Sequence, residues 1–145
     1  MGLDIAVYRS RGSLGVDLDS LGAIKDPDTG QYYVPSNFGR DVLPRELVAA
    51  IRWRVGNTSG VAELREELER VSGGRPLILI EKCLYNGIHG GDTIGNEQFG
   101  KLENEIHELQ MAHGPQLSDY LKNFLAKMLE IIQIARKEKN PIVFV

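Results

Sequence analysis

Apolar residues recur at helical spacing along four stretches of this 145-residue chain. Pro44 suits the first turn of the first stretch, and Gly56-Asn57 ends it. In the last stretch the apolar positions extend around more than one face, which indicates a helix packed on at least two sides. The pattern predicts four helices, over residues 44–55, 60–72, 97–113 and 118–139.

Three shorter stretches, residues 3–8, 77–85 and 141–145, have the β-prone apolar composition of buried strands. The run Leu77-Ile78-Leu79-Ile80 is continuously apolar, as in a central strand. Residues 142–145 predict a strand inside the sheet, and the alternative is an exposed apolar tail that pairs with another chain.

The segment Asp26-Pro27-Asp28-Thr29-Gly30 has strong turn chemistry, because proline presets φ and glycine tolerates positive φ. With the β-prone residues 31–34 after it, this segment predicts a hairpin.

These elements predict one domain, residues 1–145, of the α+β class. Its small, largely antiparallel sheet is formed by residues 3–8, 77–85 and 141–145, with the hairpin near 31–34 as a candidate further strand. The four helices cover one face. A domain of this length buries about 70% of the surface of its unfolded chain, so it can fold without metal or disulfide staples.

Composition narrows the kinds of protein that this chain can be. The chain is 42% apolar and 26% charged, as in an ordinary globular domain. Cys83 is the single cysteine, which excludes an internal disulfide and an all-thiolate zinc site. No apolar run approaches the roughly 20 residues of a membrane span. Asp4 interrupts the first apolar stretch and no basic segment precedes it, so we expect no signal peptide and a cytoplasmic protein.

The net charge of −3 is unevenly distributed, and residues 97–113 are the most acidic segment. A nucleic-acid-binding protein normally has a basic stripe interleaved with aromatic residues, which this chain lacks, so no nucleic-acid partner is expected. A solvated helix face is the favoured interpretation of the candidate basic patch, formed by Arg40, Arg45, Arg52 and Arg54.

A glycine-rich segment, residues 85–96, follows one predicted strand and precedes a helix, where α/β folds place ligands. It lacks the Gly-Lys-Ser/Thr ending of a phosphate-binding loop. His89 and Asp92 are too few ligands for a metal site, so neither a metal nor a cofactor is expected. Cys83 could serve as a nucleophile only if a base activated it, and burial as a small apolar residue is favoured.

The same segment has two interpretations. In the first it is a structural connection in which Asp92 caps backbone N–H groups. In the second it is a recognition loop whose glycines hold polar and aromatic side chains outward. The candidate binding residues of the loop are Tyr85, Asn86, His89, Asp92 and Thr93.

Three short motifs resemble those of a set of uncharacterised small bacterial and phage proteins. They are the opening Met1-Gly2-Leu3-Asp4-Ile5, the His89-Gly-Gly-Asp92 loop, and the closing Asn140-Pro141-Ile142-Val143-Phe144. The resemblance implies a similar fold, and it supplies no candidate catalytic residues. In size and negative charge the chain also resembles immunity proteins, which block a toxin by binding it.

We therefore expect a non-catalytic bacterial binding protein, an immunity-type inhibitor that neutralises a toxic effector by direct contact. A basic toxin domain would meet the acidic helix residues Glu103, Glu105 and Glu108. The alternative is a small-molecule-binding protein or small hydrolase that uses loop 86–93. A homo-oligomer is compatible with either hypothesis.

Overall fold

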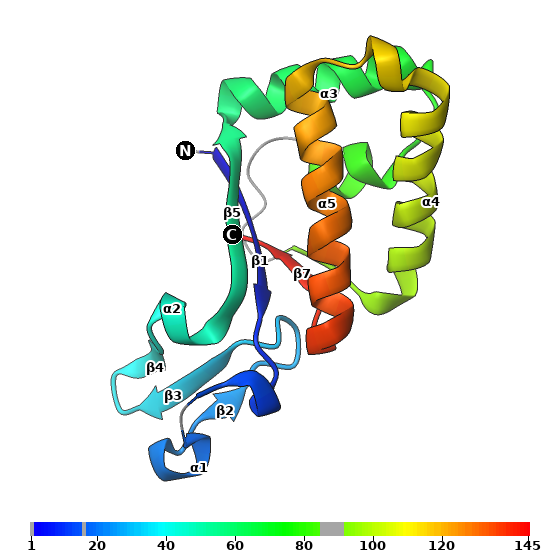
Figure 1. Ribbon diagram of the computed structural model, residues 1–145. Helices are drawn as coiled ribbons and strands as arrows, with labels where there is room; N and C mark the ends of the chain where they lie inside the picture. Colours follow the sequence, from blue (N-terminus) through cyan, green and yellow to red (C-terminus); the bar gives the residue numbers. More distant parts are fainter. Residues whose placement is uncertain (1, 16, 85–91) are drawn as a thin grey trace.

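The computed structural model describes residues 2–15, 17–84 and 92–145 (Figure 1). The strands are β1 (Gly2–Tyr8), β2 (Ile24–Lys25), β3 (Tyr32–Ser36), β4 (Gly39–Val42), β5 (Ala49–Asn57), β6 (Thr93–Ile94) and β7 (Ile142–Phe144). The α-helices are α1 (Leu18–Leu21), α2 (Arg45–Val48), α3 (Thr58–Ser72), α4 (Asn96–His113) and α5 (Asp119–Glu138). Three short turns are η1 (Arg11–Ser13), η2 (Leu79–Cys83) and η3 (Gly114–Gln116). The predicted α+β class is confirmed.

The main sheet has four strands in the order β5-β1-β7-β6, and every neighbouring pair is antiparallel. Strand β1 pairs along its whole length with β5 on one side, while Ile5 and Ala6 also pair with β7 on the other. Strand β7 therefore lies inside the sheet, where all three of its residues are buried, as predicted for residues 142–145.

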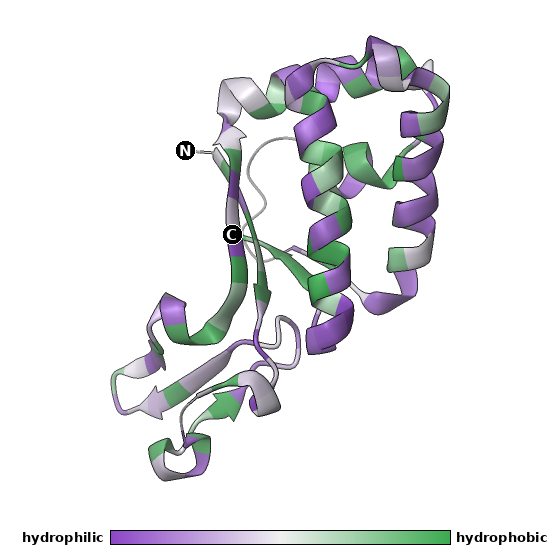
Figure 2. Cartoon of the chain, in the orientation of Figure 1, coloured by the Kyte–Doolittle hydropathy of each residue, from purple (hydrophilic) through white to green (hydrophobic). Residues whose placement is uncertain are grey.

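Helices α3, α4 and α5 cover one face of this sheet (Figure 1). Alternation along β1 sends Leu3, Ile5 and Val7 into the helix-covered core. Strand β7 is apolar through its length, and β1 is apolar from Ile5 to Val7 (Figure 2). Where β5 meets α5, Trp53 stacks on Phe124 with ring centroids 5.9 Å apart.

The last three predicted helices are confirmed as α3, α4 and α5, and side-chain caps define two of their starts. The Asn57 side chain accepts a hydrogen bond of 2.8 Å from the Gly60 N–H at the start of α3. The Ser118 hydroxyl accepts one of 3.1 Å from the Leu121 N–H at the start of α5. Gly73 ends α3 in the left-handed conformation with φ +64°.

The predicted helix over residues 44–55 is wrong. One helical turn, α2, follows Pro44, and the chain then extends as β5. Ile51, Trp53 and Val55 alternate with arginines, which is the period of a half-buried strand. The interval of four between Ile51 and Val55 also fits a helix, so helical spacing alone misassigned the segment.

The predicted strand over residues 77–85 is also wrong. Residues 79–83 form η2, a single π-helical turn, and the Leu84 N–H bonds to the Leu79 carbonyl at 2.9 Å. A continuous apolar run indicates burial but does not distinguish a strand from a buried helical turn. The strand that pairs with β7 on the side away from β1 is instead the short β6.

The predicted hairpin after Asp26 is confirmed, but it belongs to a second sheet of order β2-β3-β4. We call residues 9–48 the hairpin lobe; in Figure 1 it extends away from the three long helices. Its small apolar core packs against the helix-free face of the main sheet through Ala6, Tyr8 and Val143. The core residues from the lobe itself are Leu14, Leu18, Tyr32 and Val48.

Candidate functional site

Three residues of the predicted recognition loop, Tyr85, Asn86 and His89, lie outside the described residues. The structure places the other two at the edge of the main sheet, where Asp92 is exposed and Thr93 begins β6. The Asp92 carbonyl accepts a hydrogen bond of 2.9 Å from the Phe144 N–H, so the backbone end of the loop is fixed to β7.

The predicted acidic surface on α4 does not form as expected, because Glu105 is buried. Its carboxylate accepts the Ile78 N–H at 2.7 Å and the Leu79 N–H at 2.9 Å, which caps the start of the turn at η2. Burial raises the pKa of Glu105, and the two backbone hydrogen bonds oppose that rise. Glu105 therefore stabilises the fold, and its assignment to an exposed binding surface is wrong.

The two other predicted acidic residues have cationic partners within the chain. Glu103, half-buried on α4, forms an ion pair with Arg136 of α5. Glu108 is exposed and lies 3.5 Å from the Arg75 guanidinium. These pairs neutralise much of the negative charge that was expected to steer a basic partner.

The acids of α3 are also partly engaged. Glu67 accepts hydrogen bonds from the Ser118 N–H and hydroxyl, which joins α3 to the start of α5. Glu69 pairs with Arg65 one turn away at 3.0 Å. Several acids of the helices are thus engaged within the chain.

The hairpin lobe has a different surface. Among the residues that the structure describes, six large apolar side chains are exposed, and five of these belong to the lobe. Phe38 at the β3–β4 turn is fully exposed, and the sixth residue, Met111, lies on α4. Exposed apolar side chains that share one region are typical of a protein-binding surface. The five are Leu21, Ile24, Phe38, Val42 and Leu47.

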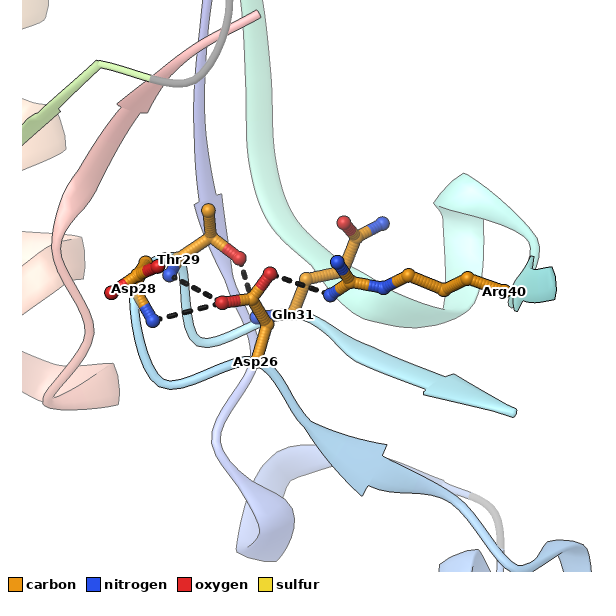
Figure 3. A network of polar contacts seen from close by, with 5 residues as sticks. All are labelled: Asp26, Asp28, Thr29, Gln31 and Arg40. Carbon is orange, nitrogen blue, oxygen red and sulfur yellow. Dashed lines mark hydrogen bonds and ion pairs between the residues drawn. The ribbon is translucent and has the colours of Figure 1, made fainter. Parts of the chain in front are cut away.

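Side-chain hydrogen bonds make the base of the lobe rigid. Figure 3 shows the Asp26 carboxylate accepting the Asp28 N–H at 2.8 Å and the Thr29 N–H at 3.4 Å, while its second oxygen meets the Arg40 guanidinium at 2.5 Å. The Arg40 hydrogen bond lowers the pKa of Asp26 below its usual value. The same guanidinium lies 3.9 Å from the Tyr33 ring centroid. Strands β2, β3 and β4 are thereby fixed together.

A second set of bonds ties the lobe to the end of α5. The buried Glu138 carboxylate accepts hydrogen bonds from the Ser10 N–H at 2.8 Å, the Ser10 hydroxyl at 2.8 Å and the Ser13 hydroxyl at 2.7 Å. The buried Asn140 amide donates to the Tyr8 carbonyl at 2.8 Å. The exposed apolar residues of the lobe are thus presented from an anchored base.

The helix-free face of the main sheet has its own charged cluster. Asp4 of β1 accepts one hydrogen bond of 3.0 Å from Arg52 and another of 3.0 Å from Arg54, both on β5. Burial acts to raise the pKa of Asp4, but the two arginines outweigh it and lower the pKa. Two cations around one anion leave this cluster with an excess positive charge.

No protein-family model, curated protein or solved structure matches the chain significantly. Within the described part of the chain, no helix combines the length and apolarity needed to span a bilayer. Over those same residues, no three histidine, cysteine or acidic side chains gather as metal ligands. The surfaces described above therefore supply the basis for a functional proposal.

Sequence reasoning missed the exposed residues of the lobe. It named Arg52 and Arg54 within a candidate basic patch, but its interpretation of that patch as a solvated helix face is wrong, because both arginines lie on strand β5. Phe38 stands between Asn37 and Gly39, where an aromatic residue in a polar turn signals exposure. Arg52 and Arg54 alternate with the apolar positions of β5, and this alternation places both on the face opposite the helices.

Proposed function

We propose that this protein is a non-catalytic binding module of the immunity type, which neutralises a toxic effector in the cytoplasm by direct contact through the hairpin lobe. The observation that carries the proposal is the concentration of exposed apolar side chains on this lobe, with Phe38 at its tip. Aromatic anchors of this kind are enriched among the residues that dominate binding energy.

The rigidity of the lobe supports the same proposal. At the tip, the Ser36 hydroxyl accepts the Phe38 N–H at 3.3 Å and donates to the Gly39 carbonyl at 3.2 Å. An aromatic side chain held on a braced turn loses little conformational entropy when it enters a partner's pocket. The acidic helix residues Glu103 and Glu108 remain candidates for a weaker rim contact, whereas Glu105 does not.

The proposal is tested by expressing the chain together with a toxin-domain protein encoded by the neighbouring gene. We expect the wild-type chain to restore growth of cells that express the toxin, and the two proteins to co-purify as a complex. Failure of the wild-type chain to restore growth, or absence of a toxin-domain gene beside it, would contradict the immunity assignment.

The small-molecule alternative has one supporting observation, which is a cavity beside Arg52. The residues that line this cavity come from other segments than loop 86–93, which the sequence favoured for a small-molecule site.

A further inference from the structure

A cavity of about 260 Å³ lies between the helix-free face of the main sheet and the hairpin lobe. The main sheet contributes Ala6 from β1 and Arg52 from β5. Tyr8 of β1 and Ala49 of β5 also line it. The hairpin lobe contributes the other walls, which are Gln31, Val42, Leu43 and Val48. The cavity thus joins residues that are far apart in the sequence, and its walls combine aliphatic side chains with the polar groups of Tyr8, Gln31 and Arg52.

The cationic group of the cavity is oriented before any ligand arrives. The Arg52 Nη2 atom donates to Asp4 Oδ2 at 3.0 Å, and the side chain of Arg52 retains 29% of its exposure. Among the described residues this is the one hydrogen bond that the Arg52 side chain makes, whereas a guanidinium has five N–H donors. Arg54 shares the same carboxylate, so Asp4 does not cancel the charge of both arginines.

We propose that this cavity binds a small monocarboxylate with a compact apolar body, whose carboxylate meets Arg52 and whose body lies against Val42, Leu43 and Val48. Arginine is suited to this role because its planar fork matches a carboxylate. Gln31 supplies an amide that can hydrogen-bond the same anion. A volume of about 260 Å³, the space of roughly nine water molecules, is large enough to hold a molecule of the size of benzoate.

This inference does not rest on the proposed function: the cavity shares Val42 with the exposed apolar residues of the lobe, but Phe38 is not among the residues that line it. A ligand in this cavity would also affect how the hairpin lobe is held. Val42 and Leu43 belong to the lobe and Arg52 to the main sheet, so a bound carboxylate would bridge the two sheets. A ligand that binds the folded chain in this way also raises its melting temperature.

The test is an amide-resolved NMR titration of the full chain with sodium benzoate. We expect saturable shifts at Ala6, Gln31 and Ala49, together with a higher melting temperature. Neutral benzamide, which has the same ring, is expected to bind about tenfold more weakly. Inorganic phosphate, an anion without an apolar body, is expected to be weaker than benzoate. The absence of saturable benzoate shifts at millimolar concentration, or equal binding of benzamide or phosphate, would overturn the proposal.

Matched variants locate the site. Arg52→Gln is expected to weaken benzoate binding about tenfold, and Arg52→Lys, which keeps the charge but loses the planar fork, is expected to weaken it less. The control is Arg70→Gln on α3, which removes one exposed arginine outside the cavity. Arg54 still pairs with Asp4 in the Arg52 variants, and circular dichroism checks that they fold. Unchanged affinity in folded Arg52→Gln would overturn the assignment.

Discussion

Gly30 packs directly against the side chain of Asn140, although the two residues are 110 positions apart in the sequence. A Cβ atom at Gly30 would lie 2.4 Å from the Asn140 Oδ1 atom, and Gly30 has φ +78°. Asn140 is itself held, because its amide donates to the Tyr8 carbonyl at 2.8 Å. This contact joins the turn of the β2–β3 hairpin to the segment between α5 and β7, so it fixes the hairpin lobe on the rest of the fold.

We expect Gly30→Ala to destabilise the protein by about 2–4 kcal/mol, because the methyl group adds a clash with a buried amide to the strain of positive φ. Gly22→Ala is the matched control. Gly22 has φ +65° with open space around its Cβ position, so only the backbone strain of about 1–2 kcal/mol applies. Urea unfolding of the two variants measures the difference, and equal destabilisation would show that the Asn140 contact contributes nothing.

The pH dependence of stability tests the anchor at Glu138. Burial acts to raise the pKa of Glu138, but hydrogen bonds from Ser10 and Ser13 outweigh it and hold the pKa below the ordinary 4.5. Because the folded-state pKa is lower than the unfolded value, the carboxylate stabilises the fold above pH 4.5. This contribution is lost as the pH falls from 4.5 through the folded-state pKa.

Glu138→Gln is therefore expected to cost about 1–3 kcal/mol at pH 7 and much less once the pH lies below both pKa values. Urea unfolding at a series of pH values gives this comparison. The control, Glu108→Gln, changes an exposed carboxylate, and a change within about 0.5 kcal/mol is expected at every pH. A cost of Glu138→Gln that is independent of pH would contradict the assigned role of the ionised carboxylate.

The carboxylate of Glu105 accepts hydrogen bonds from the N–H groups of Ile78 and Leu79, at the start of the buried turn η2. Glu105→Leu leaves the Ile78 and Leu79 N–H groups without that acceptor in the core, and we expect a loss of about 2–5 kcal/mol. Glu108→Leu, three residues further along α4 on an exposed position, is the control for the loss of charge. Thermal unfolding followed by circular dichroism compares the two. Equal melting temperatures would contradict the capping role.

The sequence predicted the parts of the fold that depend on local patterns. The turn chemistry of Asp26 acts within a few residues and occurs where expected, and the cap formed by Ser118 lies at the predicted start of the last helix. The wrong secondary-structure predictions concern two kinds of segment. In one kind the apolar spacing fits both a helix and a strand, and in the other the residues are apolar throughout. Ile51 and Val55 fit a helix and a strand equally well, and the apolar run after Leu77 forms a buried turn.

The candidate site was harder to predict, because charge along the sequence does not show which acids are paired in space. Glu105 accepts bonds from residues 26 and 27 positions away, and Glu138 from residues more than 120 positions away. These partners become neighbours only through the tertiary fold. Within the lobe, only the segment near residues 26–34 was predicted as a hairpin, and its separation from the main sheet depends on long-range strand pairing.

The central claim is that the exposed apolar residues of the hairpin lobe form a protein-contact surface, and a paired substitution tests it most directly. Phe38→Ser removes the fully exposed aromatic at the tip, while Met111→Ser removes an 87% exposed apolar side chain on α4. Calorimetric titration with the purified toxin-domain protein measures both dissociation constants. We predict that Phe38→Ser weakens binding by about 2 kcal/mol or more, whereas Met111→Ser binds like the wild type. Equal affinities for the two variants would contradict the claim.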